Sequence, residues 1–263
     1  MKNLTLLFIT ITLLFSCQKV IDVDLNDANP KLVIEANYTA QDSTVRVLIS
    51  YTANYFSGNP NPTVNNASVQ IIDQNGISTT IPFNANGAYI LSNYIPQFNT
   101  NYTMNVIVNG VTYSSSCFLP AVVNQEPITT QFLPDGFFGS APFYLTFWRF
   151  NDPVGEENYY QARVTYNDTI KDGVFDLIIQ DDKLINGNLA QRPIFTKLFQ
   201  QFDTVEIEMR SISKTVYNYY YELQSLGGGQ NSAAPANPSY YWTNKALGYF
   251  SCYGTSTQSL IIQ

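Results

Sequence analysis

The chain has 263 residues, a formal net charge of −7 and a sequence pI near 4.5, which argues against nucleic acid as an electrostatic partner. Histidine is absent, and this excludes Ser-His-Asp and Cys-His catalysis and histidine-ligated zinc. Charged residues make up 13% of the chain and aromatic residues 14%, a balance typical of an extracytoplasmic β protein.

Residues 1–16 have the pattern of a signal peptide, a short basic start followed by an apolar stretch that runs to Phe15. This stretch is too short to span a bilayer as a stable helix. The segment Leu14-Phe15-Ser16-Cys17 resembles the bacterial lipobox, in which the cysteine is acylated and becomes the mature N-terminus. We therefore expect lipidation of Cys17, because two acyl chains hold a protein on a membrane. The alternative is an ordinary secretory signal followed by a free thiol.

Residues 17–30 are acidic with few bulky side chains, and we expect a tether between the lipid and the first strand. The pattern over residues 31–120 predicts one immunoglobulin-like or fibronectin-like β-sandwich. Apolar and polar residues alternate over Val45–Tyr51, and Asn109-Gly110 is a favoured two-residue hairpin turn. The segment Pro96–Tyr102 resembles the tyrosine corner of such sandwiches, where the tyrosine hydroxyl ties down the chain before a late strand.

Prolines without strand-like alternation mark residues 121–134, and we place a linker there. Residues 135–263 then form a second β-sandwich-like domain, with its clearest amphipathic strand at Val205–Arg210. One helix is expected at residues 213–226, with Ser213 as its cap and a glycine as its stop. The predicted fold is therefore mainly β, with two β-sandwich domains, the second of which carries one helix.

Carboxylates are the remaining acid–base groups, and two adjacent pairs occur at Glu156-Glu157 and Asp181-Asp182. Neighbouring turn residues rarely converge on one substrate at the separation that a glycosidase needs, so solvated turn charges are the favoured interpretation. We expect no catalytic residue, no metal ligand and no cofactor. The chain is predicted not to be an enzyme, and a carboxylate-dependent hydrolase is the weakest hypothesis.

Two cysteines remain if Cys17 is lipidated. Cys117 and Cys252 lie near the ends of the two predicted domains, and their number is even. They form either a disulfide that joins the two domains or a pair of buried free thiols.

Aromatic residues concentrate on both sides of the glycine-rich segment that follows the predicted helix. By helical phase, Tyr217 and Tyr221 lie opposite Tyr220 and are expected to be available to a ligand or partner. Tyr241 and Trp242 are the other candidates, because exposed aromatic side chains stack on sugar rings or anchor protein interfaces. Packing in an aromatic β core is the competing explanation.

Several short segments together resemble one family. They are Pro30–Glu35, Gly87-Ala88-Tyr89, Asn151-Asp152-Pro153, Asn158-Tyr159-Tyr160, Val216–Tyr220 and Leu247–Phe250. With the lipobox, they resemble the Bacteroidota outer-membrane lipoproteins defined as a domain of unknown function, number 4249. The resemblance implies a lipid-anchored, surface-exposed protein of the outer membrane, encoded beside TonB-dependent transporters of the starch-utilisation type.

The resemblance implies an accessory protein that associates with a TonB-dependent nutrient transporter and helps to capture its substrate, a glycan or a peptide. The alternative is a glycan-binding or adhesive surface module. The segments Asp42-Ser43-Thr44 and Asp168-Thr169-Ile170 also resemble the O-glycosylation sites of that phylum. This implies modification at Ser43 and Thr169.

Overall fold

The computed structural model describes residues 29–53, 60–134, 141–171, 173, 176–227 and 239–263, and Cys17 lies outside them. The strands are β1 (Leu32–Thr39), β2 (Thr44–Tyr51), β3 (Ser68–Ile72), β4 (Ser78–Thr80), β5 (Phe83–Ala85), β6 (Ala88–Leu91), β7 (Thr100–Val108), β8 (Val111–Leu119), β9 (Thr129–Leu133), β10 (Phe143–Asn151), β11 (Tyr159–Tyr166), β12 (Thr169–Lys171), β13 (Ile178–Asp181), β14 (Leu189–Phe199), β15 (Thr204–Ile212) and β16 (Leu247–Ile261). The helical elements are α2 (Lys214–Gly227) and the short 3-10 helix η3 (Thr243–Lys245). Among the described residues, no helix is both long and apolar enough to cross a bilayer.

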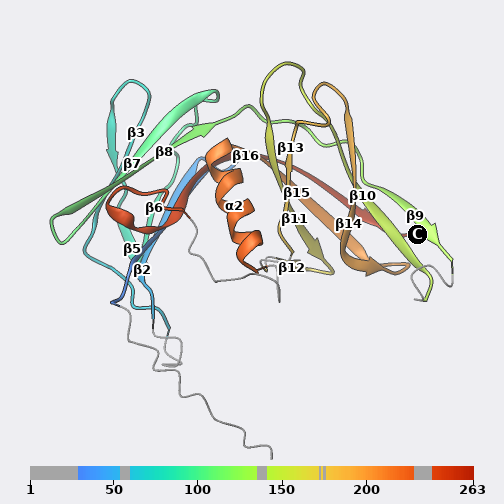
Figure 1. Cartoon of the computed structure of the whole chain (residues 1–263), viewed down its shortest axis with the longest axis horizontal. Helices are drawn as coiled ribbons and strands as arrows, with labels where there is room; N and C mark the ends of the chain where they lie inside the picture. The colour runs from blue at the N-terminus through green and yellow to red at the C-terminus, as the bar shows by residue number, and fades with distance from the viewer. Residues whose placement is uncertain (1–28, 54–59, 135–140, 172, 174–175, 228–238) are drawn as a thin grey trace, which may run out of the picture.

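The predicted mainly β, sandwich-type fold is confirmed. One nine-stranded sheet has the order β12-β11-β15-β16-β1-β2-β6-β5, with β13 also paired to β11. A four-stranded sheet, β4-β3-β7-β8, covers one part of it, and a three-stranded sheet, β14-β10-β9, covers another (Figure 1). Two separate clusters of buried apolar side chains fill these two sandwiches.

The first sandwich contains the local features that its sequence predicts. Side chains along β1 alternate between buried and half-buried, as a strand with one face on a core requires. The hydroxyl of Tyr102 accepts a hydrogen bond from the backbone N–H of Gln97 at 2.8 Å, which confirms the tyrosine corner. Asn109 and Gly110, with φ of 50° and 79°, form the hairpin turn between β7 and β8.

Strand β16 belongs to both sandwiches. Its first half, residues 247–253, pairs in parallel with β1, and its second half, residues 254–261, pairs antiparallel with β15. Figure 1 shows this long strand running from one half of the molecule to the other. The structure therefore differs from the predicted division at residues 121–134: β9 occupies part of that interval, and the last strand completes the first sandwich.

Helix α2 lies on the nine-stranded sheet between the two sandwiches (Figure 1). The Oγ of Ser213 accepts a hydrogen bond from the backbone N–H of Val216 at 3.4 Å, as expected of a helix cap. Val216 and Tyr220 are buried, and the ring of Tyr220 packs 5.6 Å from that of Tyr249 on β16. The helix is thus fixed on the strand that both sandwiches share.

Candidate functional site

A cleft of about 490 Å³ opens on the face of the nine-stranded sheet that points away from the two smaller sheets. Helix α2 borders it on one side, and strands β11 and β12 border it on another. Its lining residues are Glu35, Asn37, Thr39, Asp42, Thr44, Arg46, Gln161, Ala162, Arg163, Lys171, Asp176, Leu177, Arg210, Tyr219, Tyr220, Leu223, Tyr249 and Tyr253. Polar and aromatic side chains therefore dominate the cleft.

The face of the nine-stranded sheet forms the floor of the cleft. Strand register explains how distant parts of the sequence meet on this floor. Residues opposite each other in a sheet point to the same face, so each paired row contributes neighbouring side chains. Asn37 of β1 is opposite Arg46 of β2, and Glu35 of β1 is opposite Tyr249 of β16. In the other half, Arg210 of β15 is opposite Gln161 of β11. The floor is thus assembled from five strands.

Arginine is concentrated in the cleft, which contains three of the chain's five arginines. Arg210 is held in place, because its Nε donates to Glu208 Oε1 at 2.5 Å and its guanidinium lies 4.5 Å from the centre of the Tyr253 ring. Arg46 and Arg163 make no ion pair with any part of the chain that the structure describes. Their charges are available to an anionic group in the cleft.

Tyrosines form the wall of the cleft beside α2. The ring of Tyr219 lies 4.9 Å from that of Tyr249, and the Nδ2 of Asn37 donates to the Tyr249 hydroxyl at 3.4 Å. Burial, with smaller contributions from Tyr249 and Glu35, raises the pKa of Tyr219 to about 12. Its hydroxyl therefore stays neutral at physiological pH and is able both to donate and to accept a hydrogen bond.

Glu35 is expected to make stability depend on pH. Burial raises the pKa of its carboxyl in the folded state, so the folded chain binds this proton more tightly than the unfolded chain does. The resulting contribution to stability is fully present below the unfolded-state pKa of about 4.3 and is lost as pH rises through the folded-state value. Glu35→Gln is therefore expected to raise the melting temperature at pH 7 and to change it little at about pH 3.5.

Thermal unfolding of the two chains at both pH values measures this difference. Glu206→Gln, at an exposed position of β15, is the matched control for removal of a negative charge. An equal shift at both pH values would show that Glu35 acts through packing and not through ionisation.

Comparison with protein families assigns the chain to one family. A family described as "Domain of unknown function (DUF4249)" matches residues 18–259. The chain belongs to this family. Membership in DUF4249 confirms the family resemblance, whereas the bacterial phylum and the transporter partner are not part of what the match shows.

Similarity to other proteins is weak. No curated protein matches the chain. Solved structures that match include a cytokine receptor complex (10% identity, TM-score 0.27, covering 88% of this chain and 95% of that one). Others are the FN1–FN3 domains of chicken CNTN1 (10%, 0.26, 69% and 60%) and a bacterial ice-binding adhesin (10%, 0.23, 90% and 66%). Because these TM-scores are below 0.5, the topology of the chain is described by its own strand pairing alone.

Two of the segments that resembled DUF4249 contribute to the fold. Asp152 is only 5% exposed, and its carboxylate accepts hydrogen bonds from the Tyr160 hydroxyl at 2.5 Å and the Gly187 N–H at 3.2 Å. Gly248 lies against the backbone of Ile34, where β16 pairs with β1. These residues join strands together and lie outside the cleft.

The predicted modification sites lie on separate elements. Ser43 is half-buried in the turn between β1 and β2, with a φ of 50°, and Thr169 is exposed at the start of β12. Lipidation of Cys17 falls outside the described residues. All three modifications stay predictions.

The four aromatic candidates do not form one surface. Tyr221 is 58% exposed, as predicted, and stacks on Tyr217, with ring centres 6.2 Å apart. Tyr217 is half-buried, because a residue three positions before Tyr220 lies on the same side of the helix and not opposite it. The hydroxyl of Tyr241 donates to Glu222 Oε1 at 3.0 Å. The prediction for Trp242 is wrong: it is 3% exposed, and its indole Nε1 donates to the Ile34 carbonyl oxygen at 3.1 Å.

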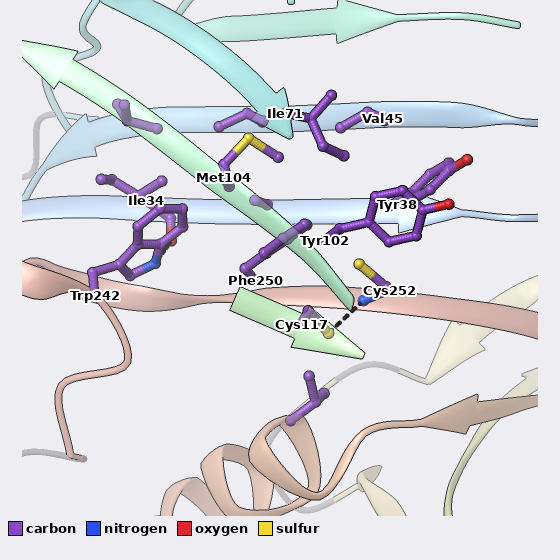
Figure 2. Packing of buried hydrophobic residues seen from close by; sticks show 14 of the residues in the cluster. Ile34, Tyr38, Val45, Ile71, Tyr102, Met104, Cys117, Trp242, Phe250 and Cys252 are labelled. Carbon is purple, nitrogen blue, oxygen red and sulfur yellow. Dashed lines mark hydrogen bonds between the residues drawn. The ribbon is translucent and has the colours of Figure 1, made fainter. Parts of the chain in front are cut away.

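Cys117 and Cys252 are adjacent, buried and free. The backbone N–H of Cys252 donates to the Sγ of Cys117 at 3.0 Å, as Figure 2 shows. Burial raises the pKa of the Cys252 thiol, so this thiol stays protonated. Of the two sequence-based alternatives, the pair of buried thiols describes this structure and the disulfide does not.

The paired carboxylates have different surroundings. Glu157 Oε2 accepts from Lys214 Nζ at 2.8 Å on the surface. Asp182 is buried, and its Oδ2 accepts from the backbone N–H of Asn158 at 2.9 Å, so the prediction of a solvated turn charge is wrong for this residue. Asp182 is therefore part of the hydrogen bonding that holds this turn.

Sequence patterns alone did not single out the cleft residues. Arg46 and Arg163 occupy positions that look like the solvated face of a strand, and Arg210 looks like a surface partner of Glu208. The sequence did show that arginine is rare and that these arginines lie on strands. This observation points to a binding site only when it is known that β16 brings the two halves into one sheet.

Proposed function

We propose that the protein is a non-enzymatic binding protein, held at the surface of the outer membrane by a lipid on Cys17. Its cleft recognises a ligand for a neighbouring TonB-dependent nutrient transporter. The lipobox-like segment and the DUF4249 match support the membrane setting. The absence of histidine from the sequence supports a role in binding.

The cleft over β16 is the observation that carries the binding role. Ligand sites are concave and combine aromatic surface with a few well-placed polar groups. Here the floor lies on a sheet that runs through both sandwiches, which favours a preformed site and reduces the entropy lost on binding. Glycan binding through Tyr241 and Trp242 is less favoured, because both already have partners within the fold.

Cys17→Ser is expected to move the protein from the membrane fraction to the soluble fraction of cells that express it. A hydroxyl cannot replace the thiol that receives the lipid, and the free energy of membrane binding comes from the buried acyl chains. Fractionation followed by intact-mass measurement tests this. Ser16→Ala, which keeps a small residue before the cysteine, is the control and is expected to stay membrane-bound. An unmodified Cys17 in the native protein would contradict the anchor.

Association with the transporter is tested by gentle detergent extraction of native membranes and purification through a tag on this chain. Recovery of a TonB-dependent barrel in constant proportion supports the accessory role. Recovery of the lipoprotein alone, with the detergent varied, counts against it.

A further inference from the structure

Three arginines form a series across the floor of the cleft. Arg46 lies on β2, Arg210 on β15 and Arg163 on β11. In the order β11-β15-β16-β1-β2, four strand spacings separate the two outer arginines, roughly 19 Å if the sheet were flat. The cleft therefore offers positive charge at its two sides and at a point between them. This arrangement suits a long ligand that carries several separated anionic groups.

The two outer arginines are available for binding. Neither makes an ion pair with the described residues, whereas Arg210 is positioned by Glu208 and Tyr253. A carboxylate that pairs with a guanidinium through two parallel N–H···O bonds is held in one orientation. Lys171 of the neighbouring strand β12, which is opposite Val164 in the register, also lines the cleft and adds a fourth positive charge on that side.

Acidic residues in the same cleft exclude a densely charged ligand. Glu35, Asp42 and Asp176 line the cleft with four basic residues, one of which, Arg210, is already paired with Glu208. A nucleic acid or another polyanion with a charge on every unit would meet these carboxylates as well as the arginines. A ligand with isolated carboxylates, separated by neutral polar units, avoids that repulsion.

The remaining lining matches ligand hydroxyl groups. Asn37, Thr39, Thr44 and Gln161 carry amides and hydroxyls, which both donate and accept hydrogen bonds, as sugar hydroxyls do. The Tyr219 and Tyr249 rings add aromatic surface beside them, of the kind that packs on sugar rings. The floor is the face of a sheet, whose backbone groups are already paired, so an extended peptide finds no edge to join there.

We propose that the cleft binds an acidic oligosaccharide, in which hydroxylated rings carry carboxylates at intervals. Arg46 and Arg163 pair with two of these carboxylates, and Arg210 interacts with the segment between them. This proposal rests on the proposed function only in using the same cleft as the binding site. Neither the lipid anchor nor the transporter is needed for it.

Calorimetric titration of the purified folded protein tests the proposal with four probes. They are an oligosaccharide in which glucuronate alternates with a neutral sugar, the methyl ester of that oligosaccharide, an oligogalacturonate with a carboxylate on every ring, and a poly-glutamate peptide of matched charge. Binding of the alternating glucuronate oligosaccharide is expected, with at least about tenfold weaker binding of its methyl ester and weaker binding of the oligogalacturonate. Affinity is also expected to fall as salt is added, since salt screens the ionic contacts.

Arg46→Gln and Arg163→Gln are each expected to weaken binding of that uronate about tenfold or more. Lys183→Gln, which removes an exposed charge outside the cleft, is the control and is expected to leave affinity unchanged. Melting curves of each variant confirm that it is folded.

Each other outcome overturns the proposal in a distinct way. Equal binding of the methyl ester rules out the anionic class, and equal binding of poly-glutamate rules out the saccharide. Failure of the alternating glucuronate to bind, or tighter binding of the oligogalacturonate, rejects the ligand class, while membrane anchoring and transporter association remain separately measurable. Uronate binding that survives both arginine substitutions places the site elsewhere.

Discussion

Gly248→Ala is expected to lower the free energy of unfolding by about 4 kcal/mol, a large share of the stability of an ordinary domain. Gly248 has a φ of +97°, a region that side chains disfavour, and a Cβ built there would lie 2.1 Å from the carbonyl oxygen of Ile34. That oxygen belongs to β1, which pairs with β16 at this point. The backbone of one strand must therefore move away from the other.

Gly76→Ala separates the two causes of this effect. Gly76 has a similarly positive φ of 78°, but nothing lies within 4 Å of its added Cβ. Only the conformational cost of about 1 kcal/mol is expected there. Chemical denaturation of both variants gives the difference. Comparable losses of unfolding free energy in the two variants would show that the close approach of β1 is not what requires glycine at position 248.

The position of Gly248 makes the expected loss global. Because β16 belongs to both sandwiches, separation of β16 from β1 removes the strand that joins the two cores. Unfolding in denaturant is therefore expected as one transition, followed equally by probes in either half. A separate early transition of the first sandwich would indicate that the second half holds β16 by itself.

Local features were predictable from the sequence because local rules determine them. The alternation over Val45–Tyr51 follows from a strand with one buried face, and Asn109-Gly110 follows from a turn that needs positive φ at both residues. Ser213 marks the start of α2 because its Oγ satisfies an end N–H of the helix. These contacts join residues that lie close in the chain.

Long-range pairing was not predictable in this way. The parallel pairing of β1 with β16 joins residues more than 200 positions apart, and no local pattern in either strand specifies the other. The predicted linker at residues 121–134 separated two regions that share one sheet. The cleft was missed for the same reason, since Arg46 and Arg210 come to line one cleft only through that pairing.

Trp242→Ala is expected to destabilise the protein by about 3–5 kcal/mol, as large-to-small substitutions of buried aromatic residues do. The indole fills the first core beside Ile34 and Phe250, as Figure 2 shows. Its Nε1 donates to the Ile34 carbonyl, the same oxygen that a Cβ added at Gly248 would meet. Trp242→Phe, which retains most of the volume but loses this donor, is expected to cost about 1–2 kcal/mol.

Tyr240→Ala is the control, because Tyr240 is two positions away and 43% exposed. Its stability is expected to stay within about 0.5 kcal/mol of the parent chain. A loss of ligand binding by Trp242→Ala would therefore reflect unfolding and not a lost contact. A ligand contact in this segment must be tested by substitution of Tyr240 or Tyr241. If Trp242→Ala melted like Tyr240→Ala while binding was lost, Trp242 would be a ligand contact and its place in the core would be wrong.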